Sequence, residues 1–195
     1  MLLVPSRIGG MAMPKPWEFD IEFDEKTGHV AKVVSGDNAP YRDYIEAHNH
    51  AIDTSTEAVK KLIPAAEKTK VVIALENVWN NLWVQPAIFA HFVKSFDHPM
   101  VKAYYDIGNH VKYAPPQEWL RALGKEIAKL HVKDFLLNQD GRDGKFVHPR
   151  DGSVNWPEVR NEIEKIGYDG FMTIEDGGLS LEEFSRRLDL IIAGK

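Results

Sequence analysis

The stretch Val71-Val72-Ile73-Ala74-Leu75-Glu76 decides the fold that this sequence predicts. Its first five residues are apolar and mostly β-branched, which is typical of a strand buried on both faces of a parallel sheet. The run ends abruptly in an acidic residue. A segment with helical spacing follows from Pro86 to Phe96, and proline suits the first turn of a helix. This part of the chain therefore predicts a strand and then a helix.

The same alternation continues on both sides of this stretch. Strands are predicted at residues 2–4, 101–105, 128–132 and 171–174, and helices at 54–68, 116–127, 156–166 and from the capping residue Ser180 onward. About five strand–helix units result. Strands that alternate with helices build a parallel sheet with helices outside it. The predicted fold class is therefore α/β, in a single domain spanning residues 1–195.

Composition restricts the classes of function. The chain has 195 residues, with 24 Lys and Arg against 29 Asp and Glu, and a formal net charge of −5. This balance disfavours nucleic acid as a partner, because phosphates attract a basic face. The chain has no cysteine, which excludes disulfides and thiol nucleophiles. No apolar run approaches the roughly 20 residues of a membrane span, and residues 1–10 do not resemble a signal peptide. We expect a cytoplasmic protein with no membrane partner.

The segment from residue 6 to residue 52 interrupts the alternation. It contains Gly9-Gly10, several prolines and Asp37-Asn38, with a predicted hairpin around residues 26–28. A connection of this length inside a compact domain usually serves as a lid or an active-site loop. His48 and His50 fall within it. They are either contacts to a metal or substrate or, as is more common, solvated loop residues.

Four polar residues stand at or near the carboxyl ends of four successive predicted strands: Glu76, Asp106, His131 and Glu175. In parallel α/β folds, ligands and catalytic groups collect at this edge of the sheet. Three carboxylates and one imidazole suit Mn²⁺, Mg²⁺, Co²⁺ or Zn²⁺, and the carboxylates would repel one another without a cation. Taken singly, each residue is more simply explained by helix capping or by pairing with a lysine. Because such residues recur on four successive strand ends, a metal site is as good an explanation as capping and lysine pairing.

The motifs around these residues resemble those of a known family. Within the xylose isomerase-like TIM-barrel superfamily, the sequence is most similar to the sugar-phosphate isomerases and epimerases, which include ketose 3-epimerases and L-ribulose-5-phosphate 3-epimerases. The motifs that carry the resemblance are Leu75-Glu76-Asn77, Tyr105-Asp106-Ile107-Gly108-Asn109, Leu130-His131-Val132-Lys133-Asp134 and Thr173-Ile174-Glu175. The resemblance covers roughly residues 54–193. It implies a (β/α) barrel whose four strand-end residues bind one divalent cation, commonly Mn²⁺.

The resemblance also implies roles in catalysis and substrate binding. Glu76 and Glu175 would exchange a proton with the substrate from opposite faces. Asn77 and His110 would contact the substrate, although His110 stands one residue farther along the chain than its counterpart in some ketose 3-epimerases. A surface position on a helix is an equal alternative for His110. Lys133 is a further candidate for binding a substrate oxygen or phosphate, unless it pairs with the neighbouring aspartate.

This set of groups suits proton transfer beside a carbonyl group. A hydrogen on the adjacent carbon is too weakly acidic for a free carboxylate to remove. A divalent cation on the carbonyl and hydroxyl oxygens stabilises the enediolate, so that one glutamate removes the proton and a second returns it. Return to the opposite face of the same carbon epimerises the sugar, and return to the neighbouring carbon isomerises it. The sequence predicts a sugar or sugar-phosphate isomerase or epimerase without separating these reactions.

The chain departs from the family pattern in its length. Such barrels have eight strands and typically about 250 residues, whereas the resemblance begins at what would be the fourth strand, Leu2-Leu3-Val4. We therefore expect a partial barrel without the three N-terminal strand–helix units, with two exposed edges and an open apolar interior. The chain is truncated, or a second copy covers its open side, or residues 6–52 fill the gap with strands of their own.

Two other functions are considered beside the isomerase. The first is a catalytically weak or inactive barrel remnant that binds metal or sugar, which the short chain favours. The second is a metal enzyme like the DNA-repair endonucleases of the same superfamily, which use several Zn²⁺ ions and extra histidines. The net charge of −5 argues against this second function.

Overall fold

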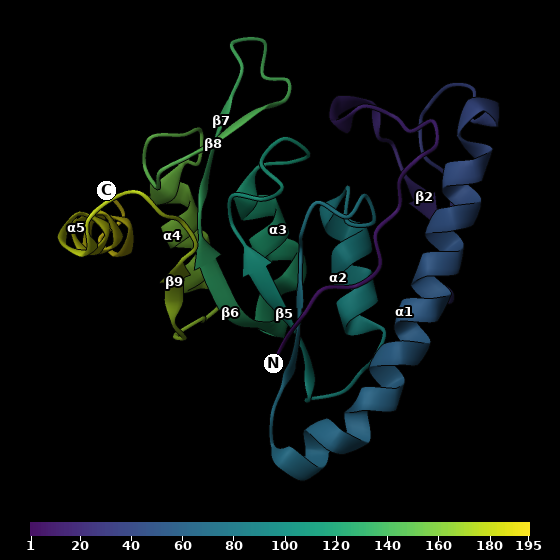
Figure 1. The fold of residues 1–195 in the computed structure, drawn as a ribbon, viewed down its shortest axis with the longest axis horizontal. Coiled ribbons are helices and arrows are strands. Elements are labelled where there is room, and N and C mark those ends of the chain that lie inside the picture. The colour runs from purple at the N-terminus through teal and green to yellow at the C-terminus, as the bar shows by residue number, and fades with distance from the viewer.

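The computed structural model describes residues 1–195 and contains one central parallel sheet (Figure 1). Five strands form it in chain order, with every neighbouring pair parallel: β1 (Leu2–Leu3), β4 (Ile73–Glu76), β5 (Val101–Asp106), β6 (Ile127–Val132) and β9 (Met172–Ile174). Because each connection contains a helix, consecutive strands lie side by side, as they do around a TIM barrel. The predicted α/β class and its five strand–helix units are confirmed. The sheet is open, and β1 and β9 are its unpaired edges.

Helices cover the sheet on one face. Figure 1 shows the three central helices packed behind the strands, with the longest helix at one side and the last helix at the other. A proline occupies the first turn of each central helix, and side chains of Asn155 and Ser180 cap the last two helices. The five helices are α1 (Arg42–Thr69), α2 (Pro86–Lys94), α3 (Pro116–Leu123), α4 (Trp156–Lys165) and α5 (Leu181–Ile192).

The helix α1 begins well before the predicted start at residue 54, so residues 42–52 are not part of a long loop. Its buried residues, from Tyr44 through His48, Ile52 and Val59, recur at helical spacing and face the core. The polar, β-branched composition around residues 48–54 concealed this stripe, because such residues are weak helix formers. His48 is buried in this helix, with Nε2 3.1 Å from the Leu82 carbonyl oxygen, and is not a solvated loop residue.

The two faces of the sheet differ in polarity. On β5, Val101, Ala103 and Tyr105 point toward the helices and are fully or almost fully buried. The alternate residues Lys102 and Tyr104 lie on the opposite face. That face would be the interior of a closed barrel, and it carries charged side chains: the Lys102 Nζ lies 2.6 Å from a carboxylate oxygen of Glu126, and the Lys129 Nζ lies 4.6 Å from the centroid of the Phe171 ring. The expected interior is open, but it is not purely apolar, because charged side chains stand beside the exposed Leu2 and Phe171.

Two antiparallel hairpins extend from the chain outside the main sheet. The first, β2 (Glu22–Phe23) with β3 (Val30–Lys32), confirms the hairpin predicted around residues 26–28. The second, β7 (Asp134–Leu137) with β8 (Gly144–Val147), follows β6 directly and rises above the sheet in Figure 1. Neither hairpin adds a strand to the parallel sheet, so residues 6–52 do not fill the gap in the barrel. The remaining elements are three short 3-10 helices, η1 (Pro16–Glu18), η2 (Ala39–Tyr41) and η3 (Gly124–Glu126).

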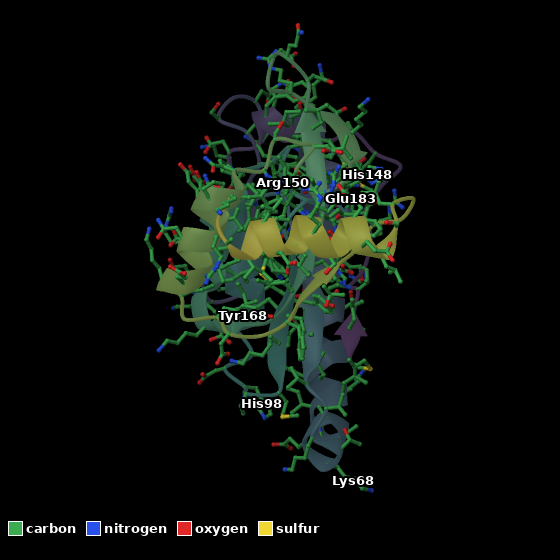
Figure 2. The ribbon with its side chains drawn as sticks, turned by 90° about the vertical axis from the view of Figure 1, so that its left-hand side faces the viewer. Lys68, His98, His148, Arg150, Tyr168 and Glu183 are labelled. Carbon is green, nitrogen blue, oxygen red and sulfur yellow. The ribbon has the colours of Figure 1, made fainter.

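The last helix, α5, lies across the edge of the molecule beside β9 and α4 (Figure 2). It is mostly exposed, and Ile191 is its only buried residue. Its Arg187 guanidinium lies 2.8 Å from a carboxylate oxygen of Asp151 and donates to the Pro149 carbonyl at 2.7 Å. The helix thereby fixes the loop that follows β8. None of the helices is long and apolar enough to cross a membrane.

Candidate metal centre

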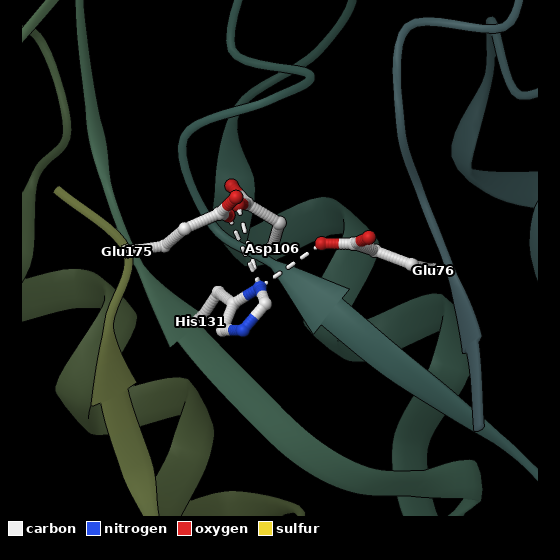
Figure 3. Close-up of side chains that lie close together, drawn as sticks. All are labelled: Glu76, Asp106, His131 and Glu175. Carbon is white, nitrogen blue, oxygen red and sulfur yellow. Dashed lines mark hydrogen bonds and ion pairs between the residues drawn. The ribbon is translucent and has the colours of Figure 1, made fainter. Parts of the chain in front are cut away.

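The four strand-end residues predicted to bind a metal converge in the structure. Each offers a ligating atom, and these atoms all lie within 4.8 Å of one another. They come from the carboxyl ends of four adjacent strands, β4, β5, β6 and β9, where the parallel arrangement brings the strand ends to one edge. Figure 3 shows the four side chains directed toward a common point: Glu76, Asp106, His131 and Glu175.

The imidazole of His131 is at the centre of this cluster. Its Nδ1 lies 2.9 Å from Glu76 Oε1, 3.1 Å from Glu175 Oε2 and 3.8 Å from Asp106 Oδ2. Glu76 and Glu175 approach this same nitrogen from different directions, from the right and the left of the view in Figure 3. One nitrogen therefore faces three carboxylates, and all four groups offer a lone pair to the same region.

The carboxylates differ in their exposure to solvent. The side chains of Asp106 and Glu76 are 0% and 7% exposed, whereas that of Glu175 is 44% exposed. Burial raises the pKa of Asp106 well above its usual value, and the nearby Glu175 raises it further. Partial burial acts to raise the pKa of Glu175 as well, but the neighbouring Asp106 and the charge of Lys133 outweigh this effect and lower that pKa. The metal-free cluster therefore favours a proton on Asp106.

The two oxygens of Asp106 have different surroundings. Its Oδ1 accepts hydrogen bonds from the backbone N–H groups of Gly108 at 2.9 Å and Asn109 at 2.8 Å. Its Oδ2 is buried and has no hydrogen-bond donor. A buried carboxylate oxygen without a partner is costly, and a cation bound among the four groups would remove that cost. Three oxygen donors and one imidazole match the ligands of Mn²⁺, Mg²⁺, Co²⁺ and Zn²⁺, so these residues fit a divalent ion.

Gly108 explains why the motif after β5 contains glycine. A Cβ atom built at this position would lie 2.7 Å from the carbonyl carbon of Lys133 and 2.9 Å from the backbone nitrogen of Asp134. Real Cβ atoms do not approach a backbone so closely. The absence of a side chain thus lets the ends of β5 and β6 come together.

Asn77 and His110, predicted to contact substrate, are buried next to the strand end that carries Asp106. Asn77 is 0% and His110 is 2% exposed. The Asn77 Nδ2 lies 3.1 Å from His110 Nδ1 and donates to the Asp106 carbonyl at 2.8 Å. Burial lowers the pKa of His110 to about 3, so its ring is neutral. The alternative of a surface histidine is wrong for His110, and contact of either residue with substrate stays a prediction.

Lys133, the third residue predicted to bind substrate, lies at the metal cluster. Its Nζ is 3.2 Å from Glu175 Oε2 and 3.7 Å from Asp106 Oδ2. It also donates to the Asn109 Oδ1 at 3.3 Å. Lys133 does not pair with Asp134, whose carboxylate accepts hydrogen bonds from four backbone N–H groups and from the Trp156 indole. The positive charge of Lys133 therefore lies beside the carboxylates of the metal cluster.

Sequence patterns did not single out several residues around this site. Asn109 supports both Lys133 and Asn77, donating to the Asn77 carbonyl at 3.2 Å. Asn109 belongs to the sequence motif that follows Asp106, and this position could have indicated a role at the site. Phe146 and His148 line a cavity beside Glu175. They had no signal, because the hairpin of β7 and β8 that brings them there was not predicted.

Comparison with known proteins identifies the family. The family model described as the xylose isomerase-like TIM barrel matches residues 17–188. A curated relative, the uncharacterised protein MJ1311 of Methanocaldococcus jannaschii, is 28% identical over 131 residues, which cover 64% of this chain and 43% of that protein. The chain thus spans less than half the length of this relative.

Solved structures of other proteins share the fold. A D-tagatose 3-epimerase-like protein has 24% identity and a TM-score of 0.62, with 77% of this chain and 58% of that chain covered. A xylose isomerase-like TIM barrel protein from Mycobacterium smegmatis in complex with magnesium has 23% identity and a TM-score of 0.59, with 73% and 51% covered. The chain spans a little over half the length of these barrels. With four of its five parallel strands and its strand-end cluster inside the matched residues, the chain belongs to the xylose isomerase-like TIM barrel family.

Proposed function

We propose that this chain is a divalent-metal-dependent isomerase or epimerase that acts on a sugar or sugar phosphate by proton transfer through an enediolate. The observation that carries the proposal is the cluster of three carboxylates and one imidazole, in which the buried Asp106 Oδ2 has no hydrogen-bond donor. The family, and the likeness to a D-tagatose 3-epimerase-like structure, support this class of reaction. The metal and the mechanism are our inference.

The four strand-end residues would hold the cation: Glu76, Asp106, His131 and Glu175. When bound, a divalent ion supplies a Lewis acid that makes the hydrogen beside a sugar carbonyl more acidic. We infer Mn²⁺ as the resident ion, because carboxylate oxygens suit Mg²⁺ and Mn²⁺ while the imidazole favours Mn²⁺ of the two. Co²⁺ and Zn²⁺ are the alternatives. The M. smegmatis relative was solved with magnesium.

Glu76 and Glu175 would move the proton. They reach His131 Nδ1 from different directions (Figure 3), and we infer that a substrate carbon held beside them would meet one carboxylate on each face. One carboxylate removes the proton, and the other returns it to the opposite face of the same carbon or to the neighbouring carbon. Glu175 is 44% exposed and opens to a cavity, whereas Glu76 is 7% exposed. A substrate would therefore enter from the side of Glu175.

The open sheet favours a second candidate, a barrel remnant that binds metal or sugar without turnover. The sheet has five strands and two unpaired edges, β1 and β9, where a closed barrel of this kind has eight strands. No further strand of the parallel sheet lies opposite the face that carries Lys102, Tyr104 and Lys129. A second copy of the chain that covers this face would restore an enclosed site. We therefore also propose that the chain forms a homo-oligomer through this face.

Metal content tests the proposal first. Inductively coupled plasma mass spectrometry of the purified chain is expected to find about one divalent ion per chain, and Glu76→Ala and His131→Ala are expected to lose it. Glu57→Ala, an exposed glutamate on α1, is the matched control and keeps the ion. A folded wild-type chain without metal contradicts the proposed function.

Exchange of hydrogen between substrate and solvent separates the two candidates. A panel of ketoses and ketose phosphates is incubated with the metal-loaded chain in heavy water, and deuterium on the substrate carbons is followed by NMR. Incorporation supports the isomerase or epimerase. Bound metal without incorporation on any member of the panel supports the remnant instead.

A further inference from the structure

A cavity of about 350 Å³ opens beside the metal cluster, within the size range of small-molecule sites. Its walls come from the end of β6, from β8 and from the residues that follow β9. The side chains that matter for its chemistry are Lys133, Lys145, Phe146, His148, Glu175 and Asp176. Glu175 belongs to both the cavity and the metal cluster, so a molecule in this cavity reaches the proposed reaction centre.

Each acidic residue on the cavity wall already has a positively charged or hydrogen-bonding partner. The Asp176 Oδ2 lies 2.6 Å from His148 Nδ1, and the Asp176 Oδ1 accepts from the Gly177 backbone at 2.7 Å. Asp151 lies 2.8 Å from the guanidinium of Arg187. Glu175 lies 3.2 Å from Lys133 and belongs to the metal cluster. Each carboxylate on this wall is therefore already engaged by another group of the protein, and Glu175 would also bind the cation.

Lys145 is the one lysine of the cavity wall that has no acidic partner. It is exposed on β8 and forms no ion pair in the structure. Phe146 follows it, and the Lys133 Nζ lies 4.9 Å from the centroid of that ring. Lysines from two different elements thus line a cavity with one aromatic wall. An apolar wall displaces water and strengthens charge attraction to a ligand.

We propose that this cavity binds an anionic group of the substrate, a phosphate or a carboxylate, through Lys145 with Lys133 on the cluster side. This inference rests on the proposed function and narrows it: the substrate is a sugar phosphate or a sugar acid rather than a neutral sugar. An ammonium group forms charge-assisted hydrogen bonds with either anion. Lys145 contacts neither the metal cluster nor its supporting residues, so it is a binding residue whose loss leaves the reacting groups in place.

The test is a binding measurement that does not require turnover. Isothermal titration calorimetry on the full chain with MnCl₂ compares three unreactive open-chain ligands: D-glucitol 6-phosphate, D-gluconate and neutral D-glucitol. We expect one or both anionic ligands to bind at least about tenfold more tightly than D-glucitol, with an advantage that falls as NaCl is added. The first two ligands distinguish phosphate from carboxylate as the recognised group.

Lys145→Gln is expected to remove most of that advantage, about tenfold, without altering the affinity for D-glucitol. Lys68→Gln is the matched control, since Lys68 is an exposed lysine at the opposite end of the molecule from His148 (Figure 2). Circular dichroism confirms that both variants fold. Equal affinity for the neutral and anionic ligands, or unchanged anion binding in Lys145→Gln, overturns the inference.

The two proposals fail separately in these experiments. If D-glucitol 6-phosphate or D-gluconate binds through Lys145 but no ketose phosphate or keto acid sugar exchanges hydrogen with solvent, the anion site stands and the proposed reaction falls. If neutral ketoses exchange hydrogen as fast as phosphorylated ones and Lys145→Gln changes neither rate, the reaction stands and the anion site falls.

Discussion

The side-chain amide of Asn77 pairs with the backbone of Asp106 across two neighbouring strands. Its Nδ2 donates to the Asp106 carbonyl at 2.8 Å, and its Oδ1 accepts from the Asp106 N–H at 2.6 Å. Both groups are fully buried. The residue after one proposed ligand thereby fixes the backbone of the next ligand, and the end of β4 is locked to the end of β5. Such supporting contacts control how tightly a metal is held.

Asn77→Ala should therefore weaken metal binding although Asn77 is not itself a ligand. The change leaves the backbone N–H and C=O of Asp106 without partners in a buried site and loosens the carboxylate. We expect the dissociation constant for Mn²⁺ to rise by about tenfold or more, measured by titration against a fluorescent chelator. Asn138→Ala, at the exposed tip of the second hairpin, should leave it unchanged. An unaltered affinity in Asn77→Ala would show that the pairing is irrelevant to the metal.

Glu175→Gln should abolish exchange of a substrate hydrogen with solvent while the fold is kept. Glutamine preserves the size of the side chain but cannot accept a proton. General acid–base groups contribute about a hundredfold or more to rates, so deuterium incorporation measured by NMR should fall at least that far. Glu164→Gln, an exposed glutamate on α4, serves as the control. Retained exchange would remove Glu175 from the mechanism.

Metal should stabilise the chain more at high pH than at low pH. The pKa of Asp106 is raised in the folded protein, first by burial and then by Glu175. Without metal, the folded chain thus holds a proton that the unfolded chain releases. Binding of this proton favours the folded state, and the contribution is lost as pH rises through the folded pKa. A cation replaces the proton, so the increase in Tm caused by MnCl₂ should grow between about pH 5.5 and pH 8.

The variant Asp106→Asn checks the cause of that pH dependence. It cannot exchange a proton for a metal, so differential scanning calorimetry should show a small increase in Tm that is the same at both pH values. An increase in wild-type Tm that does not vary with pH would contradict the assignment of the bound proton to Asp106.

His48 should make the fold sensitive to acid. Burial lowers its pKa to about 4, from 6.5 in the unfolded chain. As pH falls below the unfolded pKa, the unfolded chain gains a proton that the folded chain does not. The free energy of unfolding should therefore fall, by on the order of 3 kcal/mol from this residue, as pH approaches the folded value. Urea unfolding at several pH values measures the slope.

His48→Gln should flatten that slope, because glutamine does not titrate and its amide can donate to the Leu82 carbonyl in place of the imidazole Nε2. His50→Gln is the control, since His50 is exposed on the same helix and its loss should leave the slope as it is. Equal slopes in wild type and His48→Gln would place the acid sensitivity elsewhere.

Local patterns were sufficient to predict most of the elements. The apolar runs around Leu75 and Tyr105 predicted buried strands, and prolines and Ser180 marked helix starts, because these signals act within a few residues of the chain. The helix α1 was predicted too short, since its first part around His48 is polar and its stability comes from packing rather than helix propensity. The second hairpin was missed, because pairing of β7 with β8 depends on contacts such as those of Asp134 with the loop after β8.

The sequence by itself determined the α/β class, the family resemblance and the identity of the four clustered side chains. Parallel strands read in chain order place their carboxyl ends at one edge, so residues at those ends meet whatever the details of packing. Only the tertiary structure decided what surrounds them. It buried Asn77 and His110 next to the strand end that carries Asp106, brought Lys133 and Lys145 to one cavity, and put charged side chains on the open face of the sheet. These features arise from contacts between residues distant in the chain, which no local pattern encodes.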